Sequence, residues 1–140
     1  ARKNVANFVT EINEINKGIG AKFEFSTIDT VFSQEQAIHE TLMASIVDQL
    51  DTNSHILVDI TYGSKDMPIV LFSAMGFAEK FLRCEIDNII YGQANFKDGK
   101  AVNTRICDMI PLYYLNSVTD TINCDEPEKA KRMLKTLLSL

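Results

Sequence analysis

The stretch ILVDITYGSKDMPIVLF, residues 56–72, decides the fold class of this chain. Its first half is a short apolar run rich in β-branched residues, which is typical of a strand buried on both faces of a parallel sheet. Its second half begins behind Pro68, and proline fits the first turn of a helix. Small, polar and basic residues lie between the halves, so the stretch predicts a strand, a loop and a helix in succession.

The chain before this unit predicts a helix, a strand and a second helix. Apolar residues recur at helical spacing over residues 3–17 and stop at a pair of glycines. Residues 22–29, KFEFSTID, alternate polar and apolar side chains as a strand does. Ser33 and Gln36 then form a capping-box signature, which predicts that a second helix begins there.

The chain after this unit predicts further alternation of helix and strand. The predicted elements are a continuation of the helix to about Arg83, a strand at 87–91, a strand at 101–108 after the Asp98-Gly99 turn, a helix at 113–121, and a last helix capped by Asp125. This order predicts an α/β fold, a Rossmann-like sandwich with a mostly parallel sheet and a β-hairpin near residues 87–108. Such folds usually begin with a strand, so we expect a first strand to be missing.

The composition excludes several classes of protein. With 46% hydrophobic and 24% charged residues it is that of a globular protein. No apolar stretch approaches the roughly 18–20 uncharged residues of a membrane span. The net charge of −5 argues against binding to duplex DNA, which requires many cations to neutralise phosphates. Three widely spaced cysteines predict reduced thiols and a cytoplasmic location.

We expect neither a metal site nor a cofactor. The two histidines, His39 and His55, do not stand in a metal-ligand spacing. We expect His39 to be exposed on a helix and His55 to be solvated at the start of a strand. Three aspartates, Asp87, Asp98 and Asp108, are too dispersed and too close to turns to predict a metal site.

The loop that follows the predicted strand is the candidate binding site. In open α/β sheets, ligands bind beyond the carboxyl ends of the strands. Gly63 permits close approach of backbone to a ligand, Thr61 and Ser64 offer hydroxyls, and Lys65 offers an ammonium. The amino end of the next helix favours anions, and Asp59 is placed to orient the loop. The same chemistry also suits a plain connection.

The plain connection is the competing interpretation. Every α/β sheet has polar loops of this kind, and here Ser64 or Asp66 would simply cap the helix. The loop lacks the further glycines of GxGxxG and the GK[ST] of a P-loop, so dinucleotide and nucleoside triphosphate sites are not indicated. Residue chemistry alone therefore leaves the binding site and the turn about equally open.

The segment ILVDITYGSKDMPIVLFSAMGFAEKFL resembles the D-I-T-H-G-[FY]-R-x-x-P block of CRISPR-associated Rossmann-fold (CARF) proteins, the sensor modules of type III CRISPR systems. IIYGQANF, downstream, is similar to the strand end YG-x-x of that family. The similarity covers roughly residues 30–120, and its specific part is about ten residues long. The residues that coincide with the block are Asp59, Ile60, Thr61, Gly63 and Pro68.

The chain departs from the family pattern at two places. Tyr62 stands where histidine is common, and Ser64-Lys65 stands where an aromatic residue and arginine are common. Lysine keeps the positive charge but lacks the bidentate fork with which arginine binds phosphate.

The resemblance implies a homodimer that binds a cyclic oligoadenylate, a ring of 3′–5′ linked AMP units, between two copies of the loop. Residues 1–124 would form the CARF-like domain, incomplete at its N-terminus. Residues 125–140 would form a helix that links to an effector domain outside this chain or serves in dimerisation. The ligand-binding residues implied are Asp59, Thr61, Tyr62, Gly63, Ser64, Lys65 and, for an adenine or ribose contact, Gln93.

Two alternatives remain beside the sensor. Some CARF proteins are ring nucleases, in which a ribose 2′-hydroxyl attacks the adjacent phosphate without metal. Lys65 would then stabilise the developing charge, with Thr61 and Ser64 as positioning donors. The other alternative is an α/β interaction domain with no nucleotide ligand. The Arg-x₄₋₆-His pair of the family's ribonuclease effectors is absent, so we expect no such effector here, and no enzyme within this chain other than a metal-independent ring nuclease.

Overall fold

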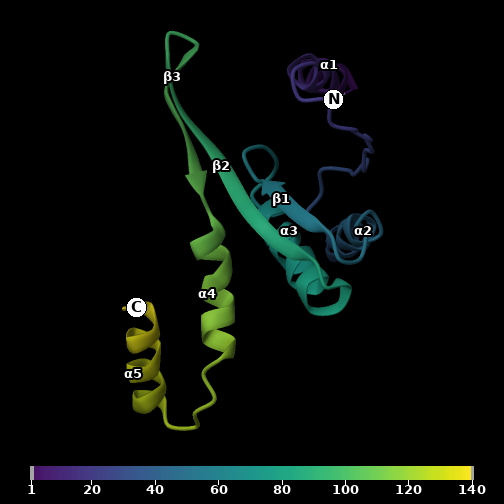
Figure 1. Cartoon of the computed structure of the whole chain (residues 1–140). Coiled ribbons are helices and arrows are strands. Elements are labelled where there is room, and N and C mark those ends of the chain that lie inside the picture. The colour runs from purple at the N-terminus through teal and green to yellow at the C-terminus, as the bar shows by residue number, and fades with distance from the viewer. Residues whose placement is uncertain (1, 140) are drawn as a thin grey trace.

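A computed structural model of the chain describes residues 2–139 (Figure 1). It holds a three-stranded sheet of order β1-β2-β3, in which β1 and β2 are parallel and β2 and β3 form an antiparallel hairpin. The predicted α/β fold class is thus confirmed, hairpin included. The elements are α1 (Arg2–Asn16), α2 (Gln36–Val47), β1 (His55–Asp59), α3 (Met67–Phe77), η1 (Ala78–Leu82), β2 (Glu85–Lys97), β3 (Lys100–Asp108), α4 (Ile110–Asp120) and α5 (Pro127–Leu138).

The unit predicted from residues 56–72 forms as expected. β1 ends at Asp59, and α3 begins at Met67 with Pro68 in its first turn. α3 continues into the short π-helix η1, and Arg83, with a φ of 57°, ends the helical segment. The predicted end of this helix near Arg83 is therefore confirmed.

One predicted strand does not form. Residues 22–29 lie in a segment without helix or strand that joins α1 to α2 (Figure 1). Alternation alone does not make a strand, because the backbone also needs a neighbouring edge with which to pair. Phe23 and Phe25 instead lie near each other, with ring centroids 6.0 Å apart, and both remain exposed.

Two predicted helix caps are also wrong. The helix α2 begins at Gln36, with Glu35 rather than Ser33 at its N-cap, and the Ser33 hydroxyl accepts a hydrogen bond from the Glu35 N–H at 3.2 Å. The helix α5 has Glu126 rather than Asp125 at its N-cap. In neither helix does a side chain cap the first turn. The capping residues in the sequence therefore predict the start of each helix only to within a few residues.

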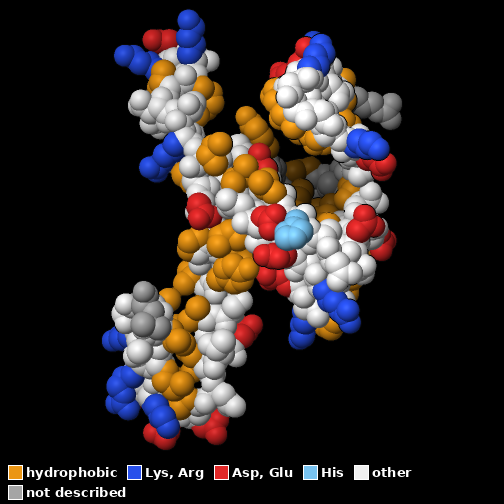
Figure 2. All heavy atoms as spheres, in the orientation of Figure 1, with side chains coloured by type: hydrophobic (Ala, Val, Ile, Leu, Met, Phe, Trp, Pro, Cys, Tyr) orange, Lys and Arg blue, Asp and Glu red, His pale blue; other side chains and the backbone are white. Residues whose placement is uncertain are grey.

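The core lies between the sheet and the two helices α2 and α3, which pack against each other. Ile89 and Ala74 are fully buried there, and Met75 is nearly so. Inward residues alternate along β1 with outward ones, so Val58 is buried whereas Leu57 is 63% exposed. Hydrophobic side chains gather over the strands and between α4 and α5 in Figure 2.

The carboxyl-terminal helices extend away from the sheet. α4 follows β3 directly, and α5 returns alongside it (Figure 1). Glu79 of η1 anchors α4, because its carboxylate accepts hydrogen bonds from the hydroxyls of Tyr113 at 2.6 Å and Tyr114 at 2.9 Å. Burial, followed by the hydrogen bond to Glu79 and the charge of Glu79, raises the pKa of Tyr113 well above its ordinary value. Among residues 2–139, no helix is long and apolar enough to cross a membrane.

Candidate functional site

The loop between β1 and α3 is held at its start by Asp59. The Thr61 N–H donates a hydrogen bond to Asp59 Oδ1 at 2.8 Å, and the Ile60 N–H extends the pairing with β2 by donating to the Ile90 carbonyl at 2.9 Å. The carboxylate therefore orients the loop backbone, which is the role that the sequence predicted for Asp59.

Thr61 joins this loop to the neighbouring strand. Its Oγ1 accepts a hydrogen bond from the Gly92 N–H at 2.7 Å. A Cβ at Gly92 would lie only 3.1 Å from Thr61 Cγ2 and Oγ1, so a larger residue there would require Thr61 to shift by a few tenths of an ångström. The two segments that resemble the CARF family, the loop after Asp59 and the segment at Gly92, are thus in direct contact.

Glycine is also required within the loop itself. Gly63 has a φ of 129°, a conformation that L side chains rarely adopt, and an added Cβ would lie 3.2 Å from Met67 Cβ. Beside it, Tyr62 is 90% exposed and Lys65 is exposed. The loop therefore presents an aromatic ring and an ammonium to solvent, close to backbone that a ligand can approach.

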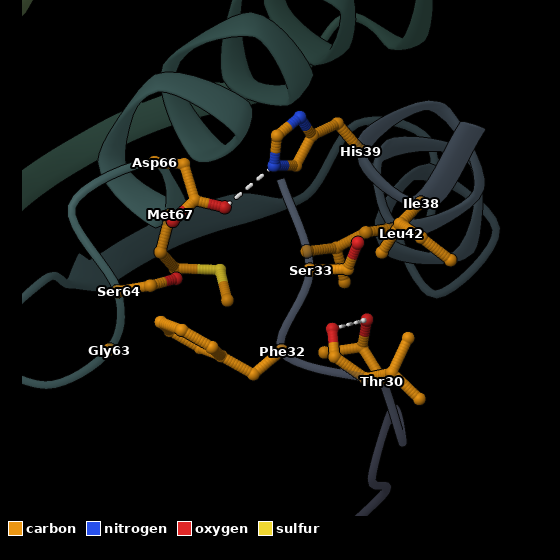
Figure 3. A pocket seen from close by; sticks show the side chains of 11 residues that line it. Thr30, Phe32, Ser33, Ile38, His39, Leu42, Gly63, Ser64, Asp66 and Met67 are labelled. Atoms are coloured by element: carbon orange, nitrogen blue, oxygen red, sulfur yellow. Dashed lines mark hydrogen bonds and ion pairs between the residues drawn. The ribbon is translucent and has the colours of Figure 1, made fainter. Parts of the chain in front are cut away.

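A pocket of about 230 Å³ opens between this loop, α2 and the segment before α2. In Figure 3 the Phe32 ring extends toward Gly63 and Met67, while Leu42 and His39 come from α2. Apolar and polar side chains share its lining, and its volume is below the roughly 300–1,000 Å³ of pockets that hold drug-sized ligands. Phe32 is 85% exposed, so one ring face is free for stacking.

His39 is not the exposed helix residue that the sequence predicted. Its Nε2 lies 2.7 Å from Asp66 Oδ2, and its side chain is only 28% exposed. The contact links α2 to the amino end of α3 across the pocket (Figure 3). Sequence reasoning missed the pair because its members are 27 positions apart and in different elements.

Asp66 stands at the N-cap of α3, but its side chain makes no capping hydrogen bond there. Hydrogen bonding by Ser64, foremost, then by the Asp66 backbone N–H, His39 and Gln34 lowers the pKa of Asp66 to about 2. The Asp66 carboxylate also offsets the positive end of the α3 dipole, so an anion is better accommodated farther along the loop.

Gln93 is hydrogen-bonded to Arg105 of β3, which the sequence predicts to contact a ligand, a partner chain or, more simply, a surface carboxylate. Arg105, its partner in the β2–β3 register, donates from Nε to Gln93 Oε1 at 2.6 Å. Gln93 follows Gly92 in β2, so this pair lies next to the strand position that contacts Thr61. The Asp98-Gly99 turn predicts that β2 and β3 pair. The register that places Gln93 opposite Arg105 also depends on a bulge at 93–95, which the turn does not predict.

The predicted site residues therefore fall into three groups. The first group lies where β1 ends beside β2, and it comprises Asp59, Thr61 and Gln93. Gly63 and Ser64 line the pocket beside Asp66. Tyr62 lines a separate hollow of about 570 Å³ with residues of α1, and Lys65 is exposed.

No protein-family model, curated protein or solved structure matches this chain. The assignment of the site accordingly depends on its own geometry and on the resemblance of its two loops.

Proposed function

We propose that this chain is the CARF-like sensor module of a type III CRISPR antiviral defence system, which binds a cyclic oligoadenylate across a homodimer. The observation that carries the proposal is the hydrogen bond between Thr61 Oγ1 and the Gly92 N–H. It joins the two segments that resemble the family at one edge of the sheet. A plain turn between β1 and α3 would not need this link or the close approach at Gly92.

The local charges fit an anionic ligand of limited size. The net charge of −5 disfavours a long nucleic acid, whereas a small ring needs only a few cations. Lys65 and Arg105 are exposed cations on the loop and on the adjoining hairpin. Since Asp66 is negative at the amino end of α3, the phosphates would lie toward Lys65 and Arg105. The pocket lined by Phe32 would then receive an adenine base of the ligand.

The apolar surface supports the proposed homodimer. Strand alternation and register place Leu57 and Ile106 on the same face of the sheet, away from α2 and α3, where they are 63% and 74% exposed. Covering such a face lowers the free energy of the assembly, because apolar surface is removed from water. A second copy with the same face would also bring two loops of residues 60–66 toward one ligand.

Titration of the purified chain with cyclic tetra-adenylate and cyclic hexa-adenylate tests this proposal. Lys65→Ala should weaken binding, because it removes a phosphate contact, while the matched change Lys100→Ala at the hairpin turn should leave affinity unchanged. Chromatography of the ligand afterwards distinguishes the sensor from a ring nuclease, which would yield linear products with a cyclic 2′,3′-phosphate. Failure of both rings to bind the wild-type chain would contradict the proposal.

A further inference from the structure

Three side chains with metal-ligand chemistry meet at the amino ends of β1 and β2. His55 Nδ1 lies 2.9 Å from Asp87 Oδ1 and 3.9 Å from Glu85 Oε2. One ligand atom from each of the three residues lies within 4.8 Å of the others. The sequence alone predicts neither His55 nor Asp87 as a metal ligand.

The parallel pairing of the strands creates this arrangement. His55 stands opposite Glu85 in the β1–β2 register. Glu85 and Asp87 are two apart on β2, and both are exposed together with His55 on the same outward face. A register shift between Ile56 and Leu57 keeps Asp87 next to the imidazole. Since Glu85 and Asp87 follow His55 by 30 and 32 positions, no local spacing in the sequence predicts the cluster.

The electrostatics of the cluster favour a cation. The carboxylates of Asp87 and Glu85 both lie within 3.9 Å of His55 Nδ1. Two carboxylates together carry twice the charge that one imidazolium neutralises. A divalent cation in place of the proton balances both carboxylates and takes the neutral imidazole as its third ligand.

We propose that His55, Glu85 and Asp87 form a binding site for a zinc-like divalent transition-metal ion. The ligands would be His55 Nδ1 and one oxygen of each carboxylate, with water completing the coordination shell. The imidazole selects zinc, copper or nickel over magnesium and calcium, which prefer oxygen ligands alone. Since these residues lie at the amino ends of the strands, the site is separate from the loop after Asp59 and does not depend on the proposed nucleotide function.

The separations of the ligand atoms suit such an ion after small side-chain movements. Metal–ligand distances near 2.1 Å place neighbouring ligand atoms of a tetrahedral site about 3.4 Å apart. The observed 2.9 Å and 3.9 Å lie on either side of this value. The three side chains are 50–75% exposed, so their rotamers are free to adjust.

Titration of the full chain with Zn²⁺ alone, followed by calorimetry, tests this site. Wild type should bind one ion per chain. His55→Gln and Asp87→Asn should each weaken binding by at least the roughly 10–100-fold that loss of a supporting group around a metal costs. The control His39→Gln removes the other histidine and should bind like wild type. Far-UV circular dichroism of each variant establishes that it is folded.

The visible spectrum of the Co²⁺-loaded chain identifies the ligands independently. Nitrogen and oxygen ligands give d–d bands without a thiolate charge-transfer band, which is the expected result. A thiolate band would assign the ion to a cysteine and overturn the proposal. Absence of wild-type binding, or equal binding by His55→Gln, would overturn it as well. Affinity should fall as pH decreases, because protons compete with the metal for the imidazole and the carboxylates.

Discussion

At the scale of single residues, Thr61 and Gly92 define the site more closely than any charged side chain does. The hydroxyl and the N–H are 2.7 Å apart, and the glycine is packed tightly enough that a Cβ would lie 3.1 Å from the threonine. This contact fixes the loop relative to β2 in the unliganded chain, as a preformed site for the proposed ligand requires. Preorganisation of this kind reduces the entropy cost of binding.

Gly92→Ala should therefore lower the free energy of unfolding by about 1–3 kcal/mol, the usual cost of overpacking. Gly76→Ala is the matched control, because its Cβ would meet only the Tyr113 hydroxyl at 3.9 Å. In the helix α3 this change should stabilise the chain by roughly 0.5–1 kcal/mol. Urea unfolding of both variants measures the difference, and equal effects would contradict the close approach at Gly92.

Asp66 gives a prediction about acid stability. Its pKa is lowered to about 2 from its ordinary value of 3.8, so the carboxylate stabilises the folded state above pH 3.8. This contribution is lost as the pH falls through about 2, where the folded state also binds the proton. Asp66→Asn should flatten this part of the pH dependence in unfolding measurements between pH 6 and pH 2.

Asp98→Asn serves as the control for this experiment. It removes one carboxylate at the hairpin turn, where the φ of 52° is one that asparagine also tolerates. This variant should keep the wild-type decline near pH 2. If Asp66→Asn declines in parallel with wild type, the hydrogen bonds from Ser64 and His39 do not stabilise the carboxylate as described.

At the scale of elements, β2 organises the molecule because it is the only strand of the sheet with partners on both sides. Its first half pairs with β1 and contributes Ile86 and Ile89 to the core, whereas its second half pairs with β3 and is largely exposed. The strand therefore joins a well-packed part of the fold to a hairpin with little core of its own.

Ile89→Ala should cost about 2–5 kcal/mol of unfolding free energy, as other buried truncations do. Ile89 is fully buried between the sheet and the helices. The same truncation at Ile106, which is 74% exposed, should stay within about 0.5 kcal/mol at low protein concentration. Chemical denaturation of both variants provides the test, and a comparable loss at Ile106 would show that this residue is packed in solution.

At the scale of the whole molecule, the sequence predicts the structure correctly where the local residue pattern and the tertiary packing agree. The apolar run at 56–60 and the proline at 68 located the strand, loop and helix, because buried strands and helix starts have local signatures. Residues 22–29 have the alternating pattern of a strand, but they pair with no strand of the sheet and form none themselves. The pairs of His39 with Asp66, Thr61 with Gly92, and His55 with Asp87 depend on tertiary register, which no local pattern encodes.

The open face of the sheet leads to a prediction about assembly. If two copies meet through this face, the double change Leu57→Lys and Ile106→Lys should shift the chain to monomer, because it places charges in an apolar interface. Asn123→Lys, a charge added at an exposed position before α5, should leave the association unchanged. Sedimentation velocity with and without cyclic tetra-adenylate measures both, and unaltered mass of the double variant would place the interface elsewhere.

The division of β2 between its two partners also has a mechanical consequence. Ile90 is the residue of β2 that pairs with both β1 and β3, and Gly92 lies just beyond it. From Gly92 to the turn at Asp98 the hairpin forms an arm of about 20 Å at 3.3 Å per residue. A rotation of about 5° at Gly92 would thus displace the tip by nearly 2 Å. A spin label at the hairpin tip would therefore report a small movement of Thr61, which contacts Gly92, as a larger displacement of the label.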